Sequence, residues 1–308
     1  MLSRAAERVY WAGRYLERAE NTARIVQQHS QLLLDLPEEA GVGWYELIRI
    51  FGAEDAFDDD HNEQATHDFL LADTNNGTSL NFCIKMARDN IRNSRDLLPQ
   101  ESWENANELY QTVRKRLAQP MPGESRFEFL SDCIGRCQQI NGILIGTMSH
   151  HNAYHFLTLG QRLERADMTS RIIDVAATYL QQNERLVLRY GSTLWTNVLK
   201  SVSGFQMYRQ FCQPEVEGLM AIDFLLNDEA FPRAVRACME EAKHTVAALP
   251  RNANLVRELD RVENSLPSPL PDELDGARVS KLMDSLQQQL ANVHTAVVKT
   301  WFLPANTA

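Results

Sequence analysis

The chain has 308 residues, of which 44% are hydrophobic and 23% charged, and its net charge is −10. This composition is typical of a globular protein of one large or two ordinary domains. The acidic balance argues against nucleic acid and against an anionic membrane surface as partners, because both carry negative charge themselves. No apolar run approaches the roughly 20 residues needed to cross a bilayer.

Apolar residues recur with the helical period almost throughout, and no run alternates as a strand would. In the first half we expect a long helix from an N-cap at Ser3 to about Leu34, ended by Pro37. The other helices expected here cover 44–51, a stretch capped by Thr78 or Ser79, 102–117 and 124–148, with an acidic loop over 54–61.

The second half repeats this order. A long helix is expected over 155–184, and Trp195 opens a helical stretch as Trp44 does. Pro232 is expected at the first position of a helix, and a last helix covers about 275–302. The fold class is therefore all-α. We expect a helical bundle of two duplicated halves, 1–149 and 150–308, related by a pseudo-twofold within one compact body.

The N-terminus and the cysteines indicate the compartment. Arg4, Glu7 and Arg8 lie inside a helical pattern, which does not fit a secretory signal peptide. The cysteines are odd in number and scattered among apolar neighbours, so we expect them to be reduced core residues of a cytoplasmic protein. They are Cys83, Cys133, Cys137, Cys212 and Cys238.

One motif occurs twice, at a constant separation of 147 residues. Residues 13–26 read GRYLERAENTARIV and residues 160–173 read GQRLERADMTSRII, with eight identical positions. Half of the chain separates the copies, which indicates a duplication. The candidate residues of the motif are Arg14, Glu17, Arg18, Glu20, Arg24, Arg162, Glu164, Arg165, Asp167 and Arg171, and Arg88, Arg92 and Arg233 are secondary candidates.

The motif has three interpretations. In the first it is a structural charge network, either across two packed helices, where Glu17 and Arg24 pair with Arg171 and Glu164, or within each half. In the second its carboxylates and arginines bind a zwitterion, such as an amino acid or peptide end, or a phosphate. The third is a two-metal carboxylate bundle, which would need histidines at Glu-x-x-His spacing that the motif lacks. We therefore expect neither a metal nor a cofactor.

The usual signatures of catalysis are absent from the sequence. There is no phosphate-binding glycine loop, dinucleotide-binding turn or serine elbow. The sequence therefore gives no basis for naming catalytic residues.

The N-terminal string MLSRAAERVYWAGRYLERAENTAR resembles the opening of the bacterial alpha-E family. The resemblance continues through stretches within 87–110, 160–167, 208–209 and 231–233, and so covers essentially the whole chain. It implies a helical fold and identifies Glu17-Arg18 and Glu164-Arg165 as the family's signature positions. A serine often follows the Pro-Arg pair in this family where the chain has Ala234, so an essential hydroxyl is not expected there.

The resemblance also implies partners. Members are typically encoded beside, or fused to, a circularly permuted ATP-grasp protein, often with a transglutaminase-like peptidase nearby. We therefore expect an accessory subunit of an ATP-grasp system that forms amide or peptide bonds, without catalytic activity of its own. One alternative is an enzyme of the same pathway that uses the motif carboxylates for transfer or hydrolysis. Another is a helical bundle that senses a ligand.

Overall fold

The computed structural model describes residues 2–182, 184–270 and 275–303, which form α-helices and short links with no strand among them. The all-α prediction is confirmed. Up to residue 151 the helices are α1 (Ser3–Asp35), α2 (Tyr45–Ile50), α3 (Glu63–His67), α4 (Leu80–Arg92), α5 (Gln100–Leu117) and α6 (Gly123–Thr147). From residue 152 they are α7 (Asn152–Gln182), α8 (Glu184–Ser201), α9 (Phe205–Phe211), α10 (Gly218–Asn227), α11 (Val235–Ala247), α12 (Ala253–Ser265) and α13 (Gly276–Val297).

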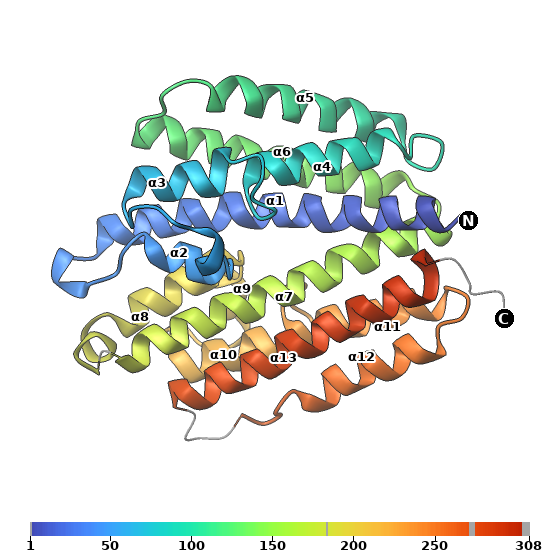
Figure 1. The fold of residues 1–308 in the computed structure, drawn as a ribbon. Coiled ribbons are helices and arrows are strands. Elements are labelled where there is room, and N and C mark those ends of the chain that lie inside the picture. Colours follow the sequence, from blue (N-terminus) through green and yellow to red (C-terminus); the bar gives the residue numbers. More distant parts are fainter. Residues whose placement is uncertain (1, 183, 271–274, 304–308) are drawn as a thin grey trace.

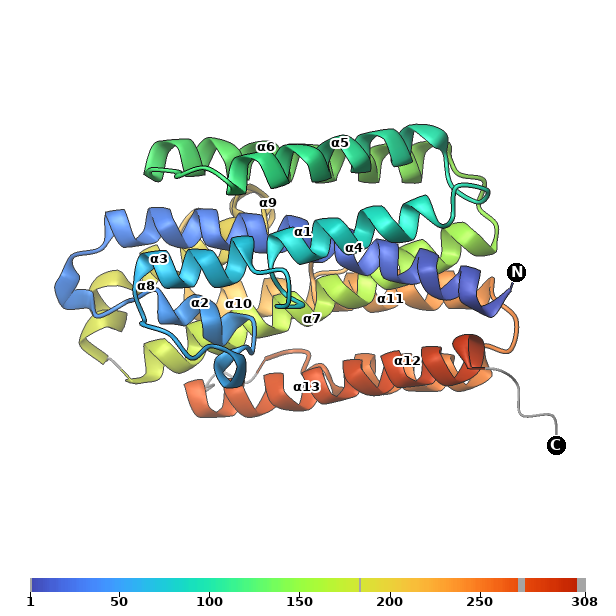
Figure 2. The same ribbon diagram turned by 45° about the horizontal axis from the view of Figure 1, so that its top comes forward.

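The helices are stacked in layers around α1 and α7 (Figure 1). Figure 2 shows the order from one outer face to the other: α5 with α6, then α1 with α4, then α7 with α11, and finally α12 with α13. α1 packs along α7, so these two helices join the first and second parts of the chain. The expected boundary at 149/150 falls in the link between α6 and α7. The duplicated origin of the two parts stays a prediction.

Most expected helices lie where the periodicity placed them, and four details of the prediction are wrong. Ser3 is inside α1, whose N-cap is Leu2. Trp195 lies within α8 rather than at its start. Pro232 precedes α11, because it lies in a turn closed by the hydrogen bond from the N–H of Ala234 to the carbonyl of Phe231, and the helix begins only after Ala234. Cys212 is exposed, whereas the other four cysteines are buried.

Other local predictions are confirmed. Ser79 caps α4, because its hydroxyl oxygen accepts a hydrogen bond from the backbone N–H of Phe82 at 3.2 Å. The acidic segment around 54–61 is largely exposed and contains one short 3₁₀ turn, Glu54–Ala56. None of the helices in the described ranges combines the length and the apolar character that crossing a bilayer requires.

The backbones of α1 and α7 approach each other at two glycines. A Cβ atom added to Gly13 would lie 2.3 Å from the carbonyl oxygen of Leu157, and one added to Gly160 would lie 2.2 Å from that of Tyr10. Both contacts are with backbone, so neither side can move away without shifting a helix. A glycine inside a helix costs about 1 kcal/mol relative to alanine. At Gly13 and Gly160 the absence of a Cβ atom is what allows the two helix backbones to come this close.

We call the place where α1 and α7 approach at Gly13 and Gly160 the crossing. The substitution Gly13→Ala tests whether the fold depends on it. Helix propensity alone would make this substitution stabilising, but overpacking against Leu157 is expected to destabilise the fold by about 1–3 kcal/mol. Gly142→Ala in α6 is the matched control, because an added Cβ meets no atom within 4 Å there. Urea denaturation should show a loss for the first variant and a gain of about 0.5–1 kcal/mol for the second. Equal effects would contradict the close approach.

Candidate functional site

Glu164 of α7 is buried beside the crossing and binds two arginines of α1. The Nε of Arg14 donates to Oε2 at 2.7 Å. Arg18 binds both oxygens, through Nε to Oε1 and through Nη2 to Oε2, the latter at 2.9 Å. The side chain of Glu164 is 1% exposed, and those of Arg14 and Arg18 are largely buried. Each carboxylate oxygen therefore has a guanidinium donor.

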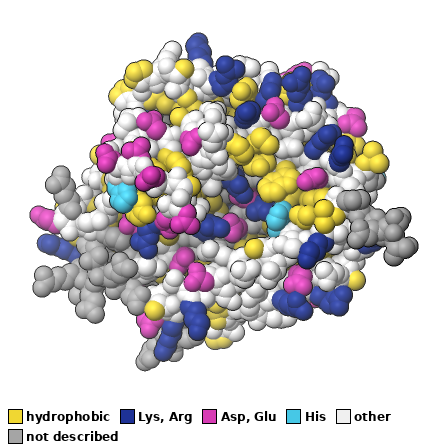
Figure 3. Space-filling view, in the orientation of Figure 1, with side chains coloured by type: hydrophobic (Ala, Val, Ile, Leu, Met, Phe, Trp, Pro, Cys, Tyr) yellow, Lys and Arg dark blue, Asp and Glu magenta, His cyan; other side chains and the backbone are white. Residues whose placement is uncertain are grey.

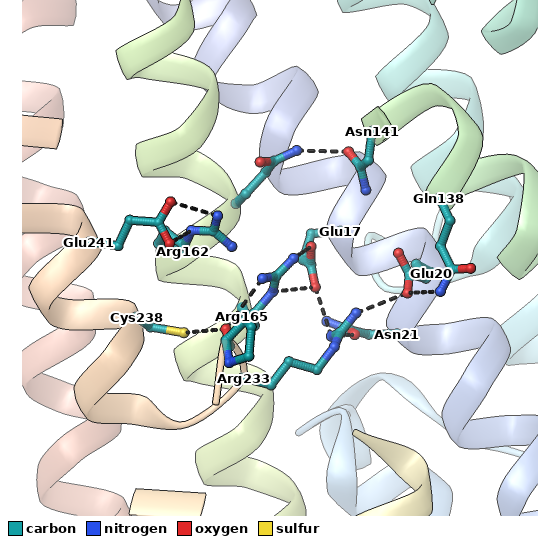
Figure 4. Close-up of polar contacts among 12 residues, drawn as sticks. Glu17, Glu20, Asn21, Gln138, Asn141, Arg162, Arg165, Arg233, Cys238 and Glu241 are labelled. Carbon is teal, nitrogen blue, oxygen red and sulfur yellow. Dashed lines mark hydrogen bonds and ion pairs between the residues drawn. The ribbon is translucent and has the colours of Figure 1, made fainter. Parts of the chain in front are cut away.

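Glu17 of α1 is bound in a corresponding way by an arginine of α7 (Figure 4). Arg165 of α7 binds it through Nε and Nη2, at 3.0 and 2.7 Å. A second guanidinium comes from Arg233, in the link before α11, whose Nη1 donates to Oε1 at 2.8 Å. Glu17 is completely buried. Glu17 and Glu164 are thus each bound by two arginines, one of which is the Glu-Arg arginine of the opposite helix.

The two copies of the motif also make equivalent contacts to the links before α4 and α11. Arg18 donates to the carbonyl of Gly77, and Arg165 donates to that of Pro232, at 3.1 and 3.3 Å. One residue further along each link, Thr22 donates to the carbonyl of Thr78 and Thr169 to that of Arg233, both at 3.0 Å. The motif therefore fixes the start of a neighbouring helix in each half.

The arginines keep both carboxylates ionised. Burial alone would raise the pKa of Glu164, but Arg18 and Arg14 outweigh it and hold that pKa at about 2. Burial is likewise outweighed at Glu17, whose pKa Arg165 and Arg233 hold well below its ordinary value. A general base is most effective with a pKa near the working pH, so these carboxylates are poorly suited to proton transfer at neutral pH.

The remaining motif residues lie outside the Glu17 and Glu164 clusters or at their edge. Glu20 accepts hydrogen bonds from Arg24, Arg233 and Gln138 at 2.7, 2.9 and 3.2 Å. Asp167 accepts from Arg171 within α7, at 2.9 Å. Arg162 lies apart from Glu17 and pairs with Glu241 of α11 at 2.7 Å (Figure 4).

The predicted pairing of Glu17 and Glu164 with Arg171 and Arg24 is wrong. Arg24 and Arg171 each lie four residues after an acid on their own helix, at the spacing that brings side chains together on one face. They bind that acid. The arginines next to Glu17 and Glu164 in the sequence point across to the other helix instead.

The secondary candidates, Arg88, Arg92 and Arg233, do not lie together in the structure. Arg233 joins the Glu17 cluster. Arg88 and Arg92 lie outside it, on α4, where their guanidinium groups stand 5.3 and 6.0 Å from the ring centre of Trp103. Lys and Arg side chains gather over this part of α4 and α5, at the upper right of Figure 3.

A chain of polar side chains, which no sequence pattern predicted, continues from the Glu164 cluster. Arg14 donates to the hydroxyl oxygen of Tyr10 at 3.4 Å, and this hydroxyl lies 2.8 Å from Nδ1 of His294 in α13. Burial, with Arg14 nearby, lowers the pKa of His294 to about 4, so the ring is neutral at pH 7. No spacing in the sequence links His294 to a motif so far away.

The whole chain matches one known family. The Alpha-E family, described as a predicted alpha-helical domain with a conserved ER motif, matches residues 1–302. This chain belongs to the Alpha-E family. Its Glu-Arg pairs, Glu17-Arg18 and Glu164-Arg165, are the residues that join α1 and α7. No curated protein and no solved structure matches the chain. In the described part of this Alpha-E protein, no group of three or more His, Cys, Asp or Glu side chains is placed to hold a metal ion.

Glu164→Gln tests whether the buried pairs hold the fold together. Removing the charge leaves Arg14 and Arg18 buried without their counterion, which should cost about 3–5 kcal/mol of unfolding free energy. Asp167→Asn is the matched control on the same helix, because its pair with Arg171 is partly exposed and should cost less than about 1 kcal/mol. Urea denaturation measures both. Equal losses would contradict a structural role for the buried pair.

His294 gives a pH dependence with a defined sign. Its folded pKa of about 4 lies below the ordinary value of 6.5, so the unfolded chain binds the proton first. Its contribution to stability is complete above pH 6.5 and is lost as the pH falls from 6.5 to about 4. Unfolding free energies at pH 7, 5.5 and 4.5 should therefore fall less steeply in His294→Gln than in the parent. The exposed His151→Gln should keep the parent's slope.

Proposed function

We propose that this Alpha-E protein is a non-catalytic partner subunit of an ATP-grasp protein that forms amide or peptide bonds. The observation that carries the proposal is the state of the two motif carboxylates. Glu17 and Glu164 are buried, and each is bound by two guanidinium groups. They are therefore engaged in holding two helices together, which favours a scaffolding role over catalysis by these groups.

The nature of the partner rests on the family. The resemblance of the chain to the alpha-E family implies association with a circularly permuted ATP-grasp protein and, in some cases, with a transglutaminase-like peptidase. Membership of the Alpha-E family supports this proposal. In such a pair the ATP-grasp protein supplies the activating chemistry, and the helical subunit supplies a binding surface or substrate contacts. We place both in the cytoplasm, where ATP is available and thiols stay reduced.

The alternative is an enzyme of the same pathway that uses the motif carboxylates. Its general acid or base would have to exchange a proton near neutral pH, and it would need room for substrate at the carboxylate. Glu164 has a pKa of about 2 and binds Arg14 and Arg18 through both oxygens. The subunit role is therefore favoured.

A tagged pulldown from the native host, read by mass spectrometry, tests the proposal. We expect stoichiometric recovery of an ATP-grasp protein, and we expect the recovered complex to hydrolyse ATP faster than the ATP-grasp protein alone. The tag without the chain is the control. Recovery of the chain by itself, together with unchanged ATP turnover on mixing the two purified proteins, would refute the subunit role.

A further inference from the structure

Two hollows lie side by side where α3 meets the start of α6. The first, of about 620 Å³, is lined by the C-terminal part of α3 and by the link 118–122 before α6. The second, of about 600 Å³, is lined by the last turns of α1 and the first turns of α6. Arg126 lines both hollows. This place is separate from the Glu-Arg motif.

Arg126 is a largely buried cation with a replaceable partner. Its side chain is 13% exposed, and its guanidinium is bound by Glu63 of α3. Glu63 itself is 49% exposed, so it can turn into solvent at little cost. A carboxylate that entered the hollow would then take the place of Glu63 on the same guanidinium.

His67 adds an unpartnered polar group at the same place. Its side chain is 4% exposed and lines the first hollow, yet neither ring nitrogen has a hydrogen-bond partner among the described residues. The nearest carboxylate oxygen, that of Glu63, stands 3.9 Å from Nδ1. Trp44, which lines the second hollow, packs against the ring with 4.7 Å between ring centres. Buried polar groups are normally satisfied, so this imidazole is available to a ligand.

The start of α6 contributes further donors. Its N-cap is Pro122, which offers no side-chain cap, and the first backbone bond inside the helix is made by the N–H of Arg126. Gly123 and Glu124, which precede it, belong to the lining of the second hollow, and their N–H groups have no acceptor within the helix. A helix start favours negative charge through its dipole. Arg126 is therefore the position that the two hollows share, with His67 in the lining of the first and the start of α6 in the lining of the second.

The second hollow is apolar beyond this position. Leu34, Phe127 and Leu130 line it, and the first two are 86% and 41% exposed. Large exposed hydrophobic side chains next to a charged anchor are typical of a site that takes an apolar group together with a polar end. The hollow therefore suits an aliphatic or aromatic side chain.

The charge of the site disfavours any ligand with more than one negative charge. Among the described residues that line the two hollows, Arg126 is the one arginine or lysine, whereas Glu63, Asp68 and Glu124 supply carboxylates. Acidic side chains also gather over α2 and α3 in Figure 3. A phosphate dianion would bring more negative charge than one guanidinium offsets. A single carboxylate matches it.

We propose that the hollows at Arg126 bind a monocarboxylate that carries an apolar side chain, such as an amino-acid derivative or the C-terminal end of a peptide. The carboxylate displaces Glu63 from Arg126, and the apolar side chain lies against Leu34 and Phe127. This inference does not depend on the ATP-grasp partner, because it concerns a site of the isolated chain.

Ligand-detected NMR and calorimetric titration of the full chain test this site. N-acetyl-L-leucine should bind, and N-acetyl-L-leucinamide, which differs only in lacking the carboxylate, should bind at least tenfold more weakly. Inorganic phosphate should not compete. N-acetyl-Gly-Gly-Leu distinguishes the two sources: tighter binding than N-acetyl-L-leucine identifies a peptide end, and weaker binding identifies a small molecule. Equal binding of acid and amide, or competition by phosphate, would overturn the proposal.

Two variants, one at Arg126 and one at Glu63, should change the affinity for the ligand in opposite directions. Arg126→Gln should weaken binding of N-acetyl-L-leucine at least tenfold, whereas Arg136→Gln, at a partly exposed arginine of the same helix that lines neither hollow, should leave it unchanged. Glu63→Gln removes the competing carboxylate and should tighten binding at least threefold. This gain does not depend on whether Arg126→Gln folds. Unchanged affinity in Glu63→Gln would refute displacement at Arg126.

Discussion

The close approach of α1 and α7 is the constraint on which the rest of the structure depends. Gly13 and Gly160 let the two backbones touch, and this brings Glu17 and Glu164 out of water. Two carboxylates cannot be buried without compensation, because the loss of hydration would be prohibitive. The arginines that follow them in the sequence supply the compensation across the interface. The glycines and the Glu-Arg pairs therefore depend on each other: the glycines allow the close packing, and the ion pairs allow the burial of charge that results.

This interface of α1 and α7 explains why so much charge lies inside an otherwise apolar bundle. Arg18 and Arg165 bind a carboxylate with one part of the guanidinium and a link carbonyl with another, at Gly77 and Pro232. The planar, five-donor fork of arginine makes both contacts at once, which lysine could not do. The starts of α4 and α11 are thereby held at fixed positions relative to α1 and α7. The motif thus orders the helices outside the central pair.

The sequence predicted the helices well, because burial on one face leaves a period of 3.6 that survives in each long segment. It also identified Glu17 and Glu164 through the repeat. It could not give their partners, because positions 18 and 24 lie on different faces of the helix, about 120° apart, and the sequence does not show which face α1 turns toward the acid on α7. Tyr10, His294 and the hollow at Arg126 left no signal, since each depends on residues that come together only in three dimensions.

The two motif carboxylates differ in where their second arginine comes from. Glu164 takes both arginines from α1, whereas Glu17 takes one from α7 and one from Arg233, far along the chain. The Glu164 cluster is therefore complete within α1 and α7 alone. The Glu17 cluster also needs the link before α11, which supplies the second counterion of this buried carboxylate. A displacement of that link would leave Glu17 with one guanidinium while Glu164 kept both of its own.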